Sequence, residues 1–235
     1  MKKFTADYYE KQYRSTFFHK RGENPSTHHF WSRQLRKLKT GGKVLEVGCG
    51  EGYFLRKISP HFTTFGIDVN YDGVVNARKR SSSTNFCVAD ASCLSFKTGT
   101  FDIVVAFDLI EHLRQPEDFL REVYRVLISP GFLILRTPNP LSWGAKVKGS
   151  AWSGDKDETH INIREPKEWR KNLKENRFEL IQEGTGALWD SPYFKFVPSI
   201  LQKIIFVGSH QLLNYAGFGI LPWWQGENWV SISKK

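Results

Sequence analysis

The sequence predicts an α/β protein built on a doubly wound, seven-stranded and mostly parallel sheet. Short apolar runs alternate with segments of helical periodicity from residue 43 onward. This alternation is typical of parallel sheets, because each crossover between parallel strands is made by a helix. The run at 101–107 is apolar almost throughout, as expected for a strand that is buried on both faces. The expected strands lie at residues 44–47, 62–67, 86–88, 101–107, 132–135, 178–181 and 229–232.

Helical periodicity fills the gaps between these strands. Two helices are expected in the first 42 residues, and the second starts near Pro25 and places Trp31, Leu35 and Leu38 on one apolar face. Asn176 should end the helix after the fifth strand in a left-handed conformation, which Asn tolerates better than most residues. The other helices are expected at residues 53–58, 74–79, 116–126 and 166–174.

The composition argues against several classes of protein. An apolar fraction of 40% with 14% aromatic residues is sufficient for a packed core, so a disordered chain is not expected. The three cysteines, Cys49, Cys87 and Cys93, have no metal-ligand spacing and fit a reducing compartment better than a disulfide framework. No apolar run follows the N-terminal lysines, and none has the length of a membrane span. The sequence therefore predicts a cytoplasmic protein.

Positive charge is concentrated at the N-terminus. Residues 1–43 hold 11 Lys and Arg against 3 Asp and Glu, which accounts for +8 of the formal net charge of +10. Such a segment attracts nucleic acid, anionic lipid or an acidic substrate, or it is a solvated helix face that only keeps the protein in solution. Nucleic acid is not the favoured partner, because no nucleic-acid-binding module is recognisable.

The strongest functional signal is a glycine-rich turn at residues 46–52, which read Glu-Val-Gly-Cys-Gly-Glu-Gly. It follows an expected strand and precedes an expected helix, where ligands of open α/β sheets bind. Glycine lets the chain turn sharply and lets a ligand approach the backbone. The dinucleotide fingerprint G-x-G-x-x-G would need a glycine at position 53, where Tyr53 stands, so a dehydrogenase is disfavoured.

Residues 43–138 resemble the class I S-adenosylmethionine-dependent methyltransferases, in which the pattern E/D-x-G-x-G-x-G wraps the methionine part of the cofactor. Two acidic residues, Asp68 and Asp90, end the second and third expected strands, where this family binds the ribose hydroxyls and the adenine amino group. The Glu111-His112 pair after the fourth strand is similar to the branch that contains the ubiquinone-biosynthesis O-methyltransferases. Asp102 begins a strand at the opposite edge and is interpreted as structural.

The resemblance implies S-adenosyl-L-methionine as the cofactor and a Rossmann-like methyltransferase fold. The implied cofactor-binding residues are Glu46, Gly48, Cys49, Gly50, Gly52, Asp68, Val69, Asp90, Ala91, Phe107 and Asp108.

The whole chain, residues 1–235, is expected to form a single methyltransferase domain. Residues 1–42 supply N-terminal helices, and residues 43–138 form the cofactor-binding core. Residues 139–235 form the substrate side, with a long loop at 139–162 and a C-terminal lid insertion before the last strand.

Two histidines are candidates for a catalytic base, since methylation of a hydroxyl requires removal of its proton. His160 is the first choice for a base or an acceptor-orienting group. His112 is the second, with a purely structural or cofactor-neighbouring role as its alternative. No metal is expected, although Glu111 with Asp108 is a weaker candidate for a divalent metal site, which some relatives in the quinone branch use.

The lid is rich in aromatic residues between 189 and 224, and its apolar pairs at 200–201, 204–205 and 212–213 have helical spacing. It is either ordinary core and cover for the acceptor, or an interfacial face for peripheral membrane contact.

The favoured function is O-methylation of a small-molecule, glycan or lipid-linked acceptor. RNA methylation and a catalytically silent, methyltransferase-like partner subunit are the alternatives. The sequence does not determine the acceptor or the oligomeric state.

Overall fold

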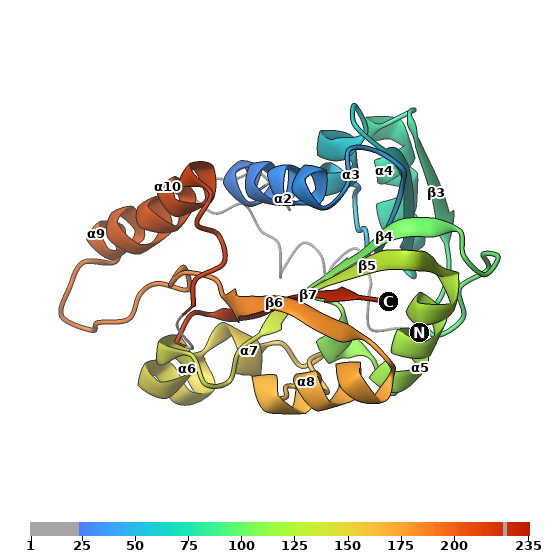
Figure 1. The fold of residues 1–235 in the computed structure, drawn as a ribbon. Coiled ribbons are helices and arrows are strands. Elements are labelled where there is room, and N and C mark those ends of the chain that lie inside the picture. The colour runs from blue at the N-terminus through green and yellow to red at the C-terminus, as the bar shows by residue number, and fades with distance from the viewer. Residues whose placement is uncertain (1–23, 223–224) are drawn as a thin grey trace.

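The computed structural model describes residues 24–222 and 225–235. Its centre is a seven-stranded sheet with the strand order β3-β2-β1-β4-β5-β7-β6 (Figure 1). Strand β7 runs antiparallel to both of its neighbours, and every other pair is parallel. The predicted doubly wound, mostly parallel sheet is confirmed. Its strands are β1 (Lys43–Val47), β2 (Thr63–Asp68), β3 (Thr84–Val88), β4 (Phe101–Phe107), β5 (Leu127–Pro138), β6 (Glu179–Thr185) and β7 (Asn228–Lys234).

Helices cover both faces of this sheet (Figure 1). The helices α2 (Pro25–Leu38), α3 (Tyr53–Ile58) and α4 (Tyr71–Arg80) lie on one face, and α5 (Pro116–Val126) and α8 (Pro166–Glu175) lie on the other. The first of the two expected N-terminal helices falls outside the described residues.

Two apolar clusters, one on each side of the sheet, hold these layers together. Strand β4 contributes to both, because Ile103 and Val105 pack on the side of α2 and α3, whereas Val104 and Ala106 pack on the side of α5. Successive side chains of a strand point to opposite faces, so a strand buried on both faces must be apolar at every position. This explains the apolar run at 103–107, and Asp102, near the start of the strand, is the one charged residue in 101–107.

The order of the strands reverses beside β1, since β2 lies on one side of it and β4 on the other. In open α/β sheets a crevice forms at this switch point, beyond the carboxyl ends of the strands. The turn after β1 and the residues that follow β2, β3 and β4 all meet there. Asp102 lies at the opposite edge, where it accepts the Lys43 amide at 2.7 Å and pairs with Lys39, in agreement with a structural role.

The prediction of a long loop at 139–162 was wrong in part, because this segment contains short helices. They are α6 (Trp143–Lys148), a 3-10 turn (Gly149–Ala151) and α7 (Ser153–Lys156). Ser142 begins α6 as an N-cap, its hydroxyl accepting the Ala145 amide at 2.9 Å. Polar residues such as Ser142 favour both loops and helix starts, so composition alone did not separate the two.

The predicted left-handed cap at Asn176 was wrong by one residue. Asn176 has a φ of −92°, and the positive φ of 67° falls on Arg177. The Phe178 amide donates to the Leu173 carbonyl at 2.9 Å. This is the hydrogen bond of a Schellman motif, in which the left-handed residue is the one that follows the C-cap. Asn176 instead uses its side-chain amide, which donates to the Asn172 carbonyl at 2.8 Å.

The lid insertion lies between β6 and β7 and is helical, as the apolar spacing predicted. It consists of α9 (Ser199–Gln202), a π-helical turn (Lys203–Val207, η3) and α10 (Gly208–Ala216), which follow one another without a break. Helix α10 lies beside α2 (Figure 1), and the Arg33 guanidinium donates to the Tyr215 carbonyl at 3.3 Å. Among the described helices, none is both long enough and apolar enough to cross a membrane.

Gly52 should be needed for packing as well as for its backbone conformation. Its φ is +73°, and a Cβ placed there would come within 2.7 Å of the Phe86 ring. Gly99 has a similar φ of +65° with nothing within 4 Å of its Cβ position. We expect Gly99→Ala to lower the free energy of unfolding by about 1 kcal/mol and Gly52→Ala by about 2–4 kcal/mol, measured by urea denaturation. An equal loss of unfolding free energy in the two variants would show that the cost at Gly52 comes from backbone strain and not from the contact with Phe86.

Candidate cofactor and acceptor site

The turn between β1 and α3 has a backbone that only glycine adopts without strain. Gly48, Gly50 and Gly52 all have positive φ angles, of 78°, 49° and 73°. The Gly48 and Cys49 amides donate to the Ile67 carbonyl at 2.8 and 3.0 Å, which ties the turn to the end of β2. The Gly50 amide then donates to the Asp68 carboxylate at 2.8 Å. The turn and the first acidic residue are therefore one hydrogen-bonded unit.

A cavity of about 710 Å³ lies at this edge of the sheet. All of the predicted cofactor-binding residues line it except Gly52, which packs against Phe86 instead. The lining residues among the predicted set are Glu46, Gly48, Cys49, Gly50, Asp68, Val69, Asp90, Ala91, Phe107 and Asp108.

Asp68 is buried and lines the cavity. One carboxylate oxygen accepts the Gly50 amide, and the other accepts the Asn70 amide at 2.8 Å. Each carboxylate oxygen has two lone pairs, so these two backbone bonds orient the group without exhausting it as an acceptor.

Asp90 stands at the exposed rim, after β3. Its Oδ1 accepts both the amide and the hydroxyl of Ser92, at 2.8 and 2.7 Å. Both bonds go to the same oxygen, which leaves Oδ2 to accept from a ligand in the cavity. The two acids thus lie at the ends of adjacent strands, as expected for parallel neighbours.

Glu46 is almost completely buried, and its Oε2 has no hydrogen-bond partner among the described residues. Burial raises the pKa of this carboxyl well above its usual range. An unpaired buried carboxylate is costly, and a positively charged group in the cavity would reduce that cost.

Asp108 and Arg136 form an ion pair on the cavity wall. The guanidinium Nε of Arg136 lies 3.0 Å from the Asp108 carboxylate, and the guanidinium stacks over the Phe107 ring at 4.9 Å. Asp108 has a φ of +50°, a strained conformation that is common at ligand sites. The sequence interpretation missed Arg136, although a charged residue at the end of an apolar strand was the signal that identified Asp68.

His28 also lines the cavity and was missed, because it comes from α2, outside the strand-and-loop pattern. Its ring lies 5.7 Å from that of Phe54. Only the packing of α2 on α3 brings it to the site.

His112 lines the same cavity and is connected to two residues from the segment after β5. Its Nδ1 lies 2.9 Å from the Thr159 hydroxyl and 3.2 Å from the Thr159 carbonyl. The Thr159 hydroxyl donates to the buried Asp157 carboxylate at 2.6 Å, so it can only accept from His112. Nδ1 therefore carries the proton in the neutral ring, and Nε2 carries the lone pair.

His160 packs against His112, with ring centroids 4.7 Å apart, but it is not among the residues that line the cavity. Its Nδ1 lies 2.7 Å from the Gly154 carbonyl, and its Nε2 lies 3.6 Å from Asp157. Burial, followed by the charge of His160, lowers the pKa of His112. The two candidate histidines are thus neighbours, and His112 is the one that reaches the cavity.

Of the weaker metal candidate, Glu111 with Asp108, the second residue pairs with Arg136. Ligand atoms of Glu111, His112 and His160 instead lie within 4.8 Å of one another. Glu111 is fully buried, and burial raises the pKa of its carboxyl well above its usual range.

The residues of this site fit S-adenosylmethionine. The glycine turn leaves the space at Gly50 open, with nothing within 4 Å of its Cβ position, and acidic acceptors lie at the ends of β2 and β3. The unpaired oxygen of Glu46 suits a ligand that carries positive charge, as a sulfonium and an ammonium do. Fold and site together define an α/β protein that binds a nucleoside cofactor.

Comparison with known proteins supports this definition. The family model described as a methyltransferase domain matches residues 17–183. A Mycobacterium tuberculosis protein named "Probable S-adenosylmethionine-dependent methyltransferase" is 33% identical over 112 residues, which cover 47% of this chain and 41% of that protein. The ubiquinone biosynthesis O-methyltransferase of Bartonella bacilliformis is 24% identical over 154 residues, which cover 61% of this chain and 62% of that protein. The chain thus spans less than half the length of the mycobacterial relative.

Solved structures share the fold. A SAM-dependent methyltransferase from Archaeoglobus fulgidus has a TM-score of 0.59 at 20% identity and covers 96% of this chain and 97% of its own. One from Aquifex aeolicus has a TM-score of 0.59 at 13% identity, covering 90% of this chain and 93% of its own. The chain belongs to the class I S-adenosylmethionine-dependent methyltransferases, and S-adenosyl-L-methionine is the cofactor that this membership implies.

Asp68→Ala should weaken the binding of S-adenosylhomocysteine by tens-fold to about a thousand-fold, because each charge-assisted bond to a ribose hydroxyl contributes about 1.5–3 kcal/mol. Isothermal titration calorimetry measures this. Asp102→Asn is the matched control, since Asp102 lies at the opposite edge of the sheet, and it should leave the affinity unchanged. An unchanged affinity in Asp68→Ala would refute the role of Asp68.

Proposed function

We propose that this chain transfers the methyl group of S-adenosylmethionine to an oxygen atom of a small-molecule, glycan or lipid-linked acceptor. The observation that carries the proposal is the convergence of the glycine turn, two acidic strand ends and a hydrogen-bonded histidine on one cavity. The cofactor supplies an electrophilic methyl group, and the protein must position the acceptor and handle its proton.

The proposed cofactor contacts follow from the positions of the acceptors and the backbone. Asp68 accepts the ribose hydroxyls, since its carboxylate is already oriented by two backbone amides. Asp90 accepts from the adenine amino group through Oδ2, and Val69 and Ala91 lie directly after these acids. The turn at 48–50 lies against the methionine part, next to Glu46.

His112 is the proposed base, because its Nδ1–H donates to Thr159 and its Nε2 therefore holds the lone pair that accepts a proton. The buried Asp157 carboxylate stabilises the positive charge that develops on the ring, through the Thr159 hydroxyl. His160, the first choice from sequence, is proposed as an orienting neighbour that lies behind His112 and shares Asp157 with it. Much of the remaining acceleration comes from positioning, which in well-oriented systems is equivalent to concentrations of about 10⁵–10⁸ M.

RNA methylation and a silent partner subunit are the competing functions. The former rests on the basic residues 1–43 alone, and it would require tight, salt-dependent RNA binding. The latter would require cofactor binding without turnover on any acceptor. The hydrogen-bonded His112 inside the cofactor cavity favours an enzyme, because a binding subunit has no need of an oriented base.

His112→Gln should reduce kcat by about 100-fold or more, which is the usual contribution of a general base. His61→Gln is a matched control, because His61 is exposed and does not line the cavity. Calorimetry with S-adenosylhomocysteine should give nearly wild-type affinity for both variants. Full turnover in His112→Gln would exclude His112 as the base.

The pH dependence of kcat should report the protonation of His112. A base acts in its neutral form, and the pKa of His112 is lowered by burial and by His160, so kcat should rise with pH through a midpoint below 6.5. The charge of Asp157 raises this pKa, so Asp157→Asn should move the midpoint to lower pH and reduce the plateau. A merely structural Asp157 would leave the midpoint in place.

Chelation with EDTA should leave turnover unchanged, because the proposed base needs no metal and Asp108 is paired with Arg136. Loss of activity that is restored by Mg²⁺ would instead assign Glu111, His112 and His160 to a metal.

A further inference from the structure

The continuous lid helix formed by α9, the η3 turn and α10 buries polar side chains more deeply than apolar ones. Its only buried side chains are Gln202 and Asn214, both of them amides. A surface helix of a globular protein normally buries its apolar stripe and exposes its polar side. In this helix the two most deeply buried side chains are polar, and Phe206 packs beside them on Tyr193, with ring centroids 4.8 Å apart.

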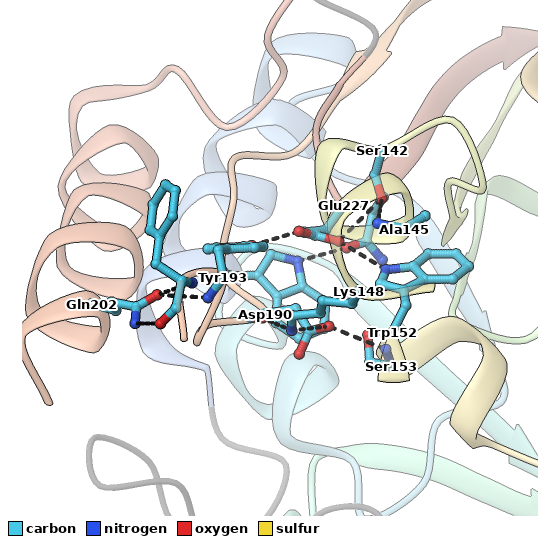
Figure 2. Close-up of polar contacts among 12 residues, drawn as sticks. Ser142, Ala145, Lys148, Trp152, Ser153, Asp190, Tyr193, Gln202 and Glu227 are labelled. Atoms are coloured by element: carbon cyan, nitrogen blue, oxygen red, sulfur yellow. Dashed lines mark hydrogen bonds and ion pairs between the residues drawn. The ribbon is translucent and has the colours of Figure 1, made fainter. Parts of the chain in front are cut away.

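Gln202, which lies beside Tyr193 in Figure 2, fixes the first half of the helix through four hydrogen bonds. Its Oε1 accepts the amides of Tyr193 and Phe194 at 2.6 and 2.9 Å. Its Nε2 donates to the carbonyls of Phe194 and Val197, both at 2.7 Å. The glutamine therefore holds the preceding loop against the helix and sets which side of α9 faces inward.

That loop is in turn anchored to the sheet through a buried carboxylate (Figure 2). The Tyr193 hydroxyl donates to Glu227, directly before β7, at 2.5 Å, and the Trp152 indole donates to the same group at 2.9 Å. Burial raises the pKa of Glu227. Lys148 pairs with Asp190 at 2.8 Å beside this cluster. The loop before the lid helix is therefore tied by buried hydrogen bonds to the residue that precedes β7.

Asn214 fixes the second half. Its side-chain amide donates to the hydroxyls of Ser26 and Thr27, at 3.4 and 3.2 Å, at the start of α2. The helix is thus held at both ends by buried polar contacts, and its exposed side is a defined surface.

The exposed side carries large apolar residues. Leu212 is 70% exposed, Ile204 is 55% exposed, and Phe196, in the loop before α9, is 99% exposed. The pairs at 200–201 and 204–205 recur every four residues, which places them along one side of the helix. We call this surface the lid face, and its residues are Phe194, Phe196, Ile200, Leu201, Ile204, Ile205, Leu212, Tyr215 and Phe218. Nine exposed large apolar residues within positions 194–218 are more than the scattered exposure of an ordinary surface, and they indicate a contact surface.

In the described segments that carry the lid face or lie beside it, every Asp, Glu, Lys or Arg side chain is basic. Residues 191–222 contain Lys195 and Lys203 but no Asp or Glu, and α2, which lies beside α10, contains Arg33, Arg36 and Lys37 and no acidic residue. A second copy of the chain, packed face to face, would bring these like charges together, which disfavours a symmetric dimer. A surface of opposite charge is the complementary partner.

We propose that the lid face docks on the surface of an anionic phospholipid bilayer, with its apolar side chains in the headgroup region and its lysines and arginines against the lipid phosphates. Exposed large apolar residues flanked by Lys and Arg are the composition of helices that lie in a membrane interface. The inference extends the proposed methyl transfer without resting on it, because binding to a bilayer and binding of the cofactor are measured separately.

Flotation with vesicles tests the proposal. The wild-type protein should float with phosphatidylcholine–phosphatidylglycerol vesicles and much less with phosphatidylcholine vesicles, and added salt should release it. The double substitution Ile204→Glu with Leu212→Glu should lower the membrane-bound fraction about tenfold or more, because it puts carboxylates where the apolar contacts are made. Both side chains are exposed, so the fold should be retained.

Ile181→Glu is the matched control, since Ile181 is 49% exposed on the edge strand β6, outside the lid face, and it should float as the wild type does. Thermal melting and calorimetry with S-adenosylhomocysteine verify that each variant is folded. The proposal is overturned if the wild type stays at the bottom of the gradient or if the double variant floats equally well. It is also overturned if light scattering shows a wild-type dimer that the double substitution dissociates, since a second copy then covers the lid face.

Discussion

The site depends on the hydrogen bond between the Gly50 amide and the Asp68 carboxylate. This bond joins the turn after β1 to the end of β2, and the neighbouring amides of Gly48 and Cys49 reinforce it through the Ile67 carbonyl. The backbone of the turn and Asp68, the proposed acceptor for the ribose hydroxyls, therefore cannot move independently. A cofactor that contacts both meets a preorganised surface, so little conformational entropy is lost when it binds.

The part of the cavity around His112 is formed by segments that are far apart in the sequence. His112 follows β4, whereas Thr159 and Asp157, which orient it, follow β5 and a run of short helices. The backbone joins the two segments as well, since the amides of Ile161 and Asn162 donate to the Glu111 carbonyl at 3.0 and 2.9 Å. The position of His112 is thus determined by the packing of the segment after β4 against the segment after β5. The proton on its Nδ1 depends on the same contact.

In the lid, the buried side-chain amides determine which side of the helix faces the protein. Large apolar residues of the same helix are exposed to solvent. Gln202 bonds the backbone of the preceding loop and Asn214 bonds the hydroxyls at the start of α2, so turning the helix over would cost these hydrogen bonds and leave two buried amides to be satisfied elsewhere. This cost explains how the helix keeps Ile204 and Leu212 in solvent.

The sequence by itself determined the sheet, the glycine turn and the acids that end β2 and β3, because these features depend on local periodicity, on turn chemistry and on the rule that ligands bind at the carboxyl ends of parallel strands. The tertiary structure decided what depends on contacts between distant segments. It selected His112 over His160 at the cavity, brought in His28 and Arg136, assigned Gly52 to packing, and buried Gln202 and Asn214 of the lid helix. Such choices rest on which side chains meet across long sequence separations, and the spacing of residues along the chain carries no information about those encounters.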